Sequence, residues 1–432
     1  QALEGGADFI GCDAGSTDAG PYYLGSGMPK SSAKAVKRDL QLILREGLKH
    51  GLPVIVGSAG YSGGRPHLES VLKVVRGIAK ENDWHFRLAA IDSEVPKETL
   101  LQAYRAGQLA PLDPAPLLTE DIIHKAERFV AMMGIEPFQQ ALSAGAQVVV
   151  AGRSSDVTIY ASLPILRGIP KNVAYHAGKI LECGAASVER RAHPDCMVAI
   201  MDEAGFTVEP PNPAMRCTPR SVFAHTLYEN SDPFHLVESG GTLVTSDSRY
   251  TAVGDRAVHV TGSRFVPATE YTVKIEGAIL AGYRSVVFAG IGDPLVIRQL
   301  DSYLAGLRTL VEKKVKESLG LPPSEYQLNW RVYGRTAEAG ARPPAEWSEC
   351  YERAILIDVV AATQAIASSI NTVAWHTGLH VPIAEYEGLI SNLAFPFSPP
   401  NISAGPVYRF CVNHIWNLHD PCGPFPVTME NI

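Results

Sequence analysis

The first glycine-bounded loop of the sequence gathers two carboxylates and two hydroxyl groups. They belong to Asp13, Ser16, Thr17 and Asp18. Two carboxylates that face one volume can hold a divalent cation such as Mg²⁺, or act as acid and base if their surroundings separate the two pKa values. Capping of a turn is the common structural role of Asp and Ser. Because the loop follows a predicted strand, we expect Asp13 and Asp18 to be catalytic. Ser16 and Thr17 would bind substrate.

The next glycine-rich loop, residues 57–66, leads into a predicted helix and is a candidate anion site. Backbone N–H groups at a helix N-terminus can cradle a phosphate or carboxylate, and an arginine can clamp it. We expect Ser58, Arg65 and His67 to bind substrate here. The glycine spacing matches neither the dinucleotide fingerprint nor a P-loop, so the pattern names no particular anion.

The same loop formally matches Gly-x-Ser-x-Gly at Ser62, and Asp156 and His176 follow in the order found in α/β-hydrolases. A nucleophile elbow places its serine at the strand-to-helix turn, whereas Ser62 trails the predicted strand by several residues. A serine-dependent acyl transferase or hydrolase is therefore an alternative that the sequence supports less well.

Arg153, Ser154 and Asp156 follow an apolar run at residues 148–151. Arg153 could bind a substrate carboxylate, and Asp156 could position a proton donor, with Ser154 beside them. An ion pair that only closes the loop is an equally good interpretation.

His176 and Lys179 share one face of a predicted helix, because they lie three residues apart. A protonated His or Lys there could give its proton to a departing hydroxyl group, although a histidine on a helix is more often structural. His225 and Glu229 have a spacing that suits metal ligands, but the second histidine of a zinc-protease motif is missing. We expect His225 to reach the domain interface, where Lys274 would meet it and both would contact substrate.

Each of four predicted strands ends directly before one of these polar loops. The strands are Asp8–Cys12, Val54–Gly57, Leu88–Ile91 and Val148–Ala151. In an open parallel sheet, side chains beyond the carboxyl ends of the strands converge on one crevice, where ligands bind. We therefore predict that the loops beginning at positions 13, 58, 92 and 152 open on the same side of one sheet and share a pocket.

Helical patterns alternate with these strands. They cover Ala33–His50, His67–Lys80, Lys97–Ala106, a helix from Glu120 to Val130 or further, Val157–Arg167 and Ala174–Ala186. This alternation predicts an α/β domain, residues 1–190, with a Rossmann-like, doubly wound parallel sheet that carries the main site. From about Ala192, hairpin-like patterns predict a second α+β domain, residues 191–432, with a mixed or antiparallel sheet that completes the crevice. Thr272–Ile275 and Ser285–Phe288 are two of its expected strands.

The composition describes a compact chain. Of its 432 residues, 46% are hydrophobic and 19% are charged, and a net charge of −7 without a basic block argues against a nucleic-acid partner. No apolar run approaches the roughly 18 residues of a membrane span and no secretory signal is visible, so we expect a cytoplasmic protein without a membrane partner. Seven scattered cysteines indicate reduced thiols. The sequence enters a strand soon after Gln1, so we expect a further strand and loop upstream.

Several ordered blocks spread over most of the chain carry a resemblance to one known family. They are Gly11–Gly27, Gly57–Gly60, Gly64–His67, Ala151–Asp156, His176–Ala185, Cys217–Pro219, Ala224–Asn230, Thr245–Asp247 and Val273–Gly277. Together they resemble the acyclic terpene utilisation AtuA family. The resemblance implies a role in degrading terpenes through CoA-linked branched acids, and it implies no catalytic residues. Some members resemble proteins that work with a small separate partner protein.

We predict a lyase of the hydratase or dehydratase type that acts on a branched hydroxy or unsaturated carboxylic acid or its CoA thioester. Such chemistry needs an anion clamp, a base for the α-proton and an acid for the departing hydroxyl group. Arg65 and Arg153 would be the clamps. Asp13 or Asp18 would be the base, and His176 or Lys179 the acid.

Other roles stay open at this stage. No nicotinamide or flavin motif is visible, and Mg²⁺ is the one cofactor that we allow. A non-catalytic subunit that presents a ligand to a partner protein is a further alternative. Aromatic residues such as Trp375 and Phe395 suit a core or a subunit interface, and we expect a homo-oligomer.

Overall fold

The computed structural model describes residues 3, 5–191, 193–334, 352–385 and 391–432. These residues form two compact units. Unit 1 comprises Gln1–Ile279 and Arg409–Ile432, and unit 2 comprises Leu280–Tyr408. The expected domain boundary at residue 190 lies inside unit 1, because the segments that follow it pack against the helix that precedes it.

Unit 1 is built on a five-stranded sheet whose first four strands are parallel, which confirms the predicted sheet. Its order is β1 (Ile10–Asp13), β2 (Val54–Gly57), β6 (Val148–Ala151), β3 (Arg87–Ile91) and β18 (Val427–Asn431). β18 pairs antiparallel with β3 and closes that edge. Since β1, β2, β6 and β3 run in the same direction, their carboxyl ends lie along one edge of the sheet.

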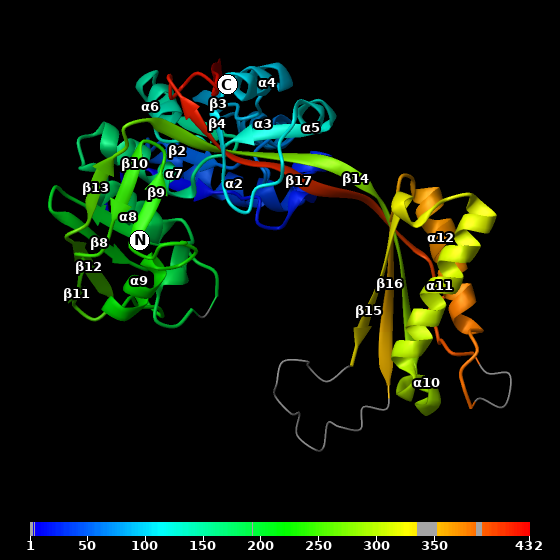
Figure 1. Cartoon of the computed structure of the whole chain (residues 1–432). Coiled ribbons are helices and arrows are strands. Elements are labelled where there is room, and N and C mark those ends of the chain that lie inside the picture. The colour runs from blue at the N-terminus through cyan, green and yellow to red at the C-terminus, as the bar shows by residue number, and fades with distance from the viewer. Residues whose placement is uncertain (1–2, 4, 192, 335–351, 386–390) are drawn as a thin grey trace. The chain divides into compact units, whose positions relative to one another are not determined.

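Helices cover both faces of this sheet (Figure 1). α2 (Ala33–Lys49) and α3 (Arg65–Asn82) pack on the face that carries Val54 and Val56. α6 (Glu136–Ser143) and α7 (Asp156–Leu166) pack on the opposite face, which carries Ile55. This is the doubly wound arrangement that the sequence predicts, with strand side chains alternating between two cores.

The remaining elements near this sheet are short. They are α1 (Pro21–Ser26), α4 (Lys97–Arg105), β4 (Leu109–Pro111), α5 (Glu120–Lys125) and β5 (Arg128–Ala131). The expected helix from Glu120 to Val130 is wrong in its second half. Thr119 caps α5 as its sequence indicates, but Phe129 and Val130 are buried in β5, which pairs with a later strand.

After α8 (Lys171–Leu181) and the short 3-10 helix η1 (Gly184–Ser187), unit 1 continues as two small antiparallel sheets and one helix. One sheet contains β7 (Val198–Met201), β8 (Gly205–Glu209), β11 (Arg249–Val253) and β12 (Ala257–Thr261). The other contains β9 (His235–Glu238), β10 (Gly241–Val244) and β13 (Arg264–Pro267), and the helix is α9 (Pro219–Thr226). Val173 and Ala177 of α8 share a core with β8 and β12.

Two long strands continue from one unit into the other. β14 (Tyr271–Ile291) replaces the two short strands expected at Thr272–Ile275 and Ser285–Phe288, and its beginning pairs antiparallel with β5. β17 (Ile402–Leu418) pairs near its end with β4. Small residues such as Gly277 and Gly282 interrupt the apolar pattern of β14, so the sequence alone does not show that the strand is continuous.

Unit 2 contains an antiparallel sheet and helices that share one core with it. Its elements are α10 (Pro294–Arg298), α11 (Leu300–Leu319), the 3-10 helix η2 (Pro323–Glu325), β15 (Tyr326–Tyr333), β16 (Arg353–Ala361) and α12 (Gln364–Leu379). β16 pairs with β15 on one side and with the second half of β14 on the other. Among the described residues, no helix has the length and apolar character needed to cross a membrane.

Candidate functional site

The polar loops that follow β1, β2, β3 and β6 pack directly against one another at the carboxyl edge of the sheet. A Cβ atom on Gly63 would lie 2.2 Å from the backbone nitrogen of Arg153, and one on Gly15 would lie 2.3 Å from the Cα of Tyr61. Only glycine allows such approaches. Ser93 adds a further tie, because its hydroxyl donates to the Gly63 carbonyl at 2.8 Å and accepts from the Arg153 N–H at 2.6 Å. The prediction that these loops open on one side of one sheet is confirmed, and the pocket that they were expected to share stays a prediction.

Arg153 is the centre of the polar groups at this edge, and its side chain is only 7% exposed. Its Nε donates to Glu276 Oε2 at 3.3 Å, and its Nη1 lies 3.4 Å from Asp156 Oδ1. Nη1 also donates to the Ser58 hydroxyl at 3.3 Å. Among the described residues, Nη2 makes no hydrogen bond.

Ser58 is held in an unusual conformation beside Arg153. Its φ of +47° lies in the left-handed region, which residues other than glycine avoid. Such backbone strain persists only where surrounding structure enforces it, and it is concentrated at functional sites. In this conformation the Ser58 hydroxyl accepts a hydrogen bond from Arg153 Nη1 at 3.3 Å.

Glu276 of β14 is a buried carboxylate that holds three donors. Its Oε1 accepts from the Thr17 hydroxyl at 2.7 Å and from Lys274 Nζ at 2.8 Å, and its Oε2 faces Arg153. Burial raises the pKa of Glu276, but the charges of Arg153 and Lys274 outweigh burial and lower it overall. Glu276 therefore stays ionised and fixes Arg153, Lys274 and Thr17 in place. We call Asp13, Thr17, Ser58, Arg153, Asp156, Lys274 and Glu276 the Arg153 cluster.

Asp13 and Asp156 are the two carboxyl groups of the Arg153 cluster that are only partly buried. Burial and the charge of Asp156 raise the pKa of Asp13 to about 8, and Asp18 adds to this effect. Burial also raises the pKa of Asp156, while the charges of Arg153 and Lys179 oppose it. Two coupled carboxyl groups of this kind hold one proton between them near neutral pH. Asp13 is the better place for that proton, because Asp156 lies against the guanidinium group.

A second polar group adjoins Asp156. Lys179 of α8 forms a close ion pair with Glu182, and both side chains are buried. Ser155 donates to Glu238 Oε2 at 2.7 Å. Burial raises the pKa of Glu182 to about 8 and the pKa of Glu238 to about 7. The charge of Asp156 adds to the rise at both residues. Lys179 was predicted from the sequence, and the structure brings it next to Asp156.

His225 lies at the border of this second group and is buried. Its ring stacks on Tyr228 with the ring centroids 5.6 Å apart. One oxygen of Glu182, the sulfur of Cys183 and one ring nitrogen of His225 lie within 4.8 Å of one another. The sequence suggested Glu229 as a second metal ligand beside His225. In the structure, the potential metal ligands grouped with His225 are instead Glu182 and Cys183, which follow α8.

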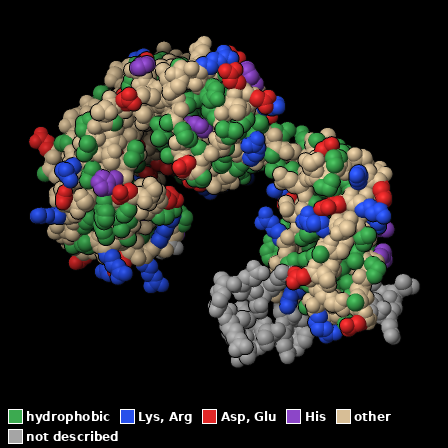
Figure 2. All heavy atoms as spheres, viewed as in Figure 1, with side chains coloured by type: hydrophobic (Ala, Val, Ile, Leu, Met, Phe, Trp, Pro, Cys, Tyr) green, Lys and Arg blue, Asp and Glu red, His purple; other side chains and the backbone are tan. Residues whose placement is uncertain are grey.

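Figure 2 shows that unit 1 is hollowed between the part that carries α9 and β12 and the part that carries α2, with acidic side chains inside the hollow.

Asp18 and Ser16 lie in the loop after β1, where the Ser16 hydroxyl accepts from the Asp18 N–H at 3.2 Å. Ser154 is buried, and its hydroxyl has no hydrogen-bond partner among the described residues.

Two residues of the predicted anion site have other partners. Arg65 is exposed, and its Nε pairs with Asp92 Oδ2 at 2.7 Å. His67 is buried in the first turn of α3, where its Nε2 lies 3.0 Å from the Tyr23 carbonyl. The structure therefore places neither side chain in the Arg153 cluster, although both belong to loops at the same edge of the sheet.

His176, predicted as a catalytic acid, is fully buried on α8. Its Nε2 lies 3.1 Å from the Thr226 hydroxyl and 3.3 Å from the Tyr250 hydroxyl, and its ring packs against Phe206. Burial lowers its pKa to about 3, so the ring is neutral at physiological pH. A neutral imidazole keeps one N–H but is a far weaker acid than an imidazolium, and the contacts of His176 suit a structural role.

Ser62 does not have the surroundings of a nucleophile. Its hydroxyl is sealed from solvent and has no hydrogen-bond partner among the described residues. A catalytic serine needs a base within hydrogen-bond reach. The geometry therefore gives the serine-dependent alternative no support.

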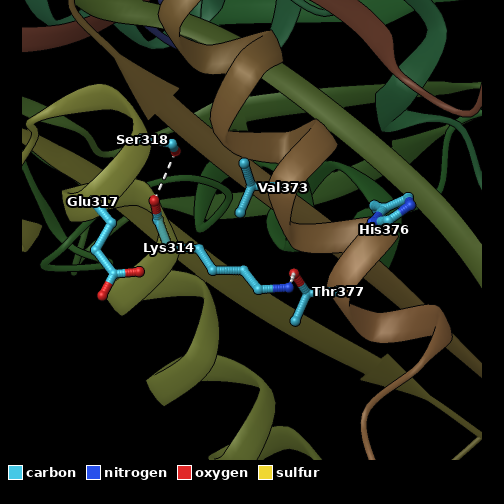
Figure 3. Close-up of a pocket in the computed structure, with 6 residues that line it drawn as sticks. All are labelled: Lys314, Glu317, Ser318, Val373, His376 and Thr377. Carbon is cyan, nitrogen blue, oxygen red and sulfur yellow. Dashed lines mark hydrogen bonds between the residues drawn. The ribbon is translucent and has the colours of Figure 1, made fainter.

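A hollow in unit 2 differs in character from the Arg153 cluster. It measures about 360 Å³ and lies between α11 and α12, where Lys314 reaches across to donate to the Thr377 hydroxyl at 3.1 Å (Figure 3). The other residues that line it are Glu317, Ser318, Val373 and His376. Lys314, the one lysine among these lining residues, already donates a hydrogen bond. Among the described residues that line this hollow, Glu317 is the one acidic residue, so the hollow has no counterpart of the acids in the Arg153 cluster.

Sequence reasoning singled out Glu276 with Lys274, because the two alternate with apolar residues along one strand, but gave Glu276 no place among the site residues. It missed Glu182, which lies three residues after Lys179 on a helix. It also missed Glu238, which lies at the end of a short strand and is followed by Ser239 and two glycines. Thr17, Ser58, Arg153, Asp156 and Lys274 were predicted, and the structure brings them together.

A family model described as acyclic terpene utilisation family protein AtuA matches residues 29–387 of the chain. This region includes Arg153, Asp156, Lys179 and Glu276, and it begins after Asp13. Comparisons with curated proteins and with solved structures found no match. Because the matched region makes up most of the sequence, the chain belongs to the acyclic terpene utilisation AtuA family.

Proposed function

We propose that this protein is a carbon–oxygen lyase that removes or adds water on a branched hydroxy or unsaturated carboxylic acid or its CoA thioester. The observation that carries the proposal is the convergence of Asp13, Asp156 and Arg153 at the carboxyl edge of a parallel sheet. An acid, a base and a cation within one site are what a dehydration requires. The family's link to acyclic terpene utilisation supports a branched acyl substrate.

Asp13 and Asp156 take the acid and base roles. In the dehydration direction, the Asp156 carboxylate accepts the α-proton of the substrate. The bond between the β-carbon and the hydroxyl oxygen then breaks, and the Asp13 carboxyl group gives its proton to that oxygen, so that water leaves. Asp156 ends protonated and Asp13 ionised, and solvent exchange restores the starting state. Hydration reverses each of these steps.

Arg153 stabilises the charge that develops on the substrate. Removal of an α-proton places negative charge on the carboxylate or thioester oxygen, and a fixed donor aimed at that oxygen lowers the barrier. Nη2 can serve as this donor, since Nε and Nη1 are bound to Glu276, Ser58 and Asp156. Glu276 and Ser58 are positioning residues, because they hold the guanidinium group and do not face the substrate in this scheme.

The test is an assay of the purified full chain on a panel of branched 2-enoyl and 3-hydroxyacyl acids and CoA thioesters. Loss of the enoyl absorbance reports hydration, and uptake of deuterium at the α-carbon in D2O reports proton abstraction. General acid–base catalysis is worth roughly 100- to 10,000-fold, so Asp13→Asn and Asp156→Asn should each lower turnover by at least about 100-fold. Turnover by the wild type should fall above about pH 8, where Asp13 loses its proton.

Asp121→Asn is the matched control, because Asp121 is an exposed aspartate of α5 that pairs only with Lys125. It should leave turnover unchanged. The assignment of roles fails if Asp13→Asn folds like the wild type and retains full turnover. The lyase class itself fails if no acid or thioester of the panel is hydrated and none exchanges its α-proton.

A further inference from the structure

His225 has a feature that its neighbours in the protein do not explain. It is 7% exposed, and its Nε2 is sealed from solvent without a hydrogen-bond partner among the described residues. The backbone carbonyl of Lys179 lies near the His225 ring. When the ring carries its proton on Nδ1, Nε2 has a free lone pair. Burying such an acceptor without a partner costs free energy, so something is expected to occupy it.

Two further electron-pair donors lie beside this ring. A carboxylate oxygen of Glu182 and the sulfur of Cys183 lie within 4.8 Å of one another and of a His225 nitrogen. In a tetrahedral zinc site, bonds of about 2.0 Å to nitrogen or oxygen and about 2.3 Å to sulfur put the ligand atoms roughly 3.3–3.8 Å apart. Small inward rotations of these side chains would therefore close the group around one ion.

We propose that Glu182, Cys183 and His225 form a binding site for a transition-metal ion of the Zn²⁺ type. One thiolate, one imidazole and one carboxylate match the preferences of Zn²⁺, whereas Mg²⁺ prefers oxygen ligands and near-octahedral geometry. Three protein ligands leave a fourth position open for water or another small ligand, which is the pattern of catalytic rather than structural zinc sites.

The surroundings of the three side chains also fit a metal site. Metal-binding histidines usually donate their second ring N–H to a carboxylate or a backbone carbonyl, and the Lys179 carbonyl lies near the His225 ring. Lys179 pairs with one oxygen of Glu182, which leaves the second carboxylate oxygen for the ion. Binding releases the Cys183 thiol proton to solvent, so the ion is held by two negative ligands and one neutral ligand.

This site is separate from the acid–base pair of the proposed lyase, and the inference does not depend on that reaction. The two sites are nevertheless coupled electrostatically, since the charge of Lys179 opposes the rise that burial causes in the pKa of Asp156. An ion held by Glu182 would add positive charge to the same surroundings.

The experiment uses the purified full chain, freed of metal with a chelator and then titrated with Zn²⁺ or Co²⁺. We expect one ion per chain by elemental analysis. We also expect a thiolate-to-cobalt charge-transfer band in the Co²⁺ form. X-ray absorption of the Zn²⁺ form should show one sulfur at about 2.3 Å with nitrogen or oxygen neighbours at about 2.0 Å. None of these measurements uses enzymatic activity.

Cys183→Ser should abolish the charge-transfer band, and His225→Gln should weaken binding by at least about 100-fold, since loss of an outer contact alone costs 10- to 100-fold. Cys196→Ser and His235→Gln are matched controls at exposed positions and should bind like the wild type. The proposal is overturned if the wild type shows only oxygen and nitrogen neighbours. It is also overturned if the band survives in Cys183→Ser, or if no ion binds at micromolar concentration.

Discussion

Asp13 should make the stability of unit 1 fall as pH rises. Burial and the charge of Asp156 raise its pKa from 3.8 to about 8 in the folded state, whereas an unfolded chain leaves it near 3.8. Between about pH 4 and pH 8 the folded protein therefore holds a proton that the unfolded protein has lost. Linkage then requires the free energy of unfolding to decrease as pH increases through this interval. Asp13→Asn removes the titrating group and keeps a side chain of similar shape.

The size of the effect follows from the pKa difference. One bound proton changes the free energy of unfolding by at most about 1.4 kcal/mol per pH unit. Between pH 5 and pH 8 the upper limit is therefore about 4 kcal/mol. The measured value should be smaller, because Asp156 shares the proton and the local structure can relax around an ionised Asp13. At pH 5 wild type and Asp13→Asn should be similarly stable, and at pH 8 the variant should be the more stable protein.

Urea unfolding at pH 5, 6, 7 and 8, followed by circular dichroism, measures this difference. The difference between their free energies reports the ionisation of Asp13 together with the change that it causes in Asp156. Asp121→Asn should show a difference from wild type that does not change with pH. Parallel curves for wild type and Asp13→Asn across the whole range would refute the reasoning, because Asp13 would then be ionised in the folded protein without cost.

Other substitutions test the packing of the site. Gly63→Ala and Gly107→Ala both force alanine to a φ of +69°, but only the Cβ at position 63 meets another atom, 2.2 Å from the Arg153 nitrogen. Gly63→Ala should therefore lower the unfolding free energy by about 1–3 kcal/mol more than Gly107→Ala, and equal losses in urea unfolding would argue against tight packing of these loops. Glu276→Gln leaves Arg153 buried without its main partner and should cost about 3–5 kcal/mol, measured in the same way. Glu120→Gln, in an exposed pair with Arg105, should change little. Leu44→Ala in the core under α2 should cost about 2–5 kcal/mol, and a loss below 1 kcal/mol would mean that this core collapses around the gap.

The sheet of unit 1 could be predicted because its signals are local. Each parallel strand is a short buried apolar run with a turn after it, and helices with one apolar stripe lie between the strands. β2 and β6 were predicted with their observed bounds for this reason. The same local reading failed at Val130, since a strand of four residues after a helix looks like the next helical turn until its partner in β14 is known.

The candidate site could be predicted only where its residues follow the strands of that sheet. Arg153 and Asp156 lie directly after β6, and Asp13 ends β1, so the strand rule places them at the edge. Glu276 and Glu238 come from strands more than 80 residues further along the chain, and no pattern near them indicates which loop they meet. Arg65 shows that position in a loop is not enough. It follows a strand of the same sheet, yet its side chain pairs with Asp92 and is not part of the Arg153 cluster.

The two proposals have a common electrostatic origin. Carboxyl groups outnumber cations where the Arg153 cluster meets α8: Asp13, Asp18, Asp156, Glu182, Glu238 and Glu276 lie near Arg153, Lys179 and Lys274. Ionising all the acids in a partly buried site would be costly, so some must keep a proton or gain a counter-ion. A retained proton on Asp13 gives the site a general acid near neutral pH. A divalent ion at Glu182, Cys183 and His225 would neutralise part of the same excess.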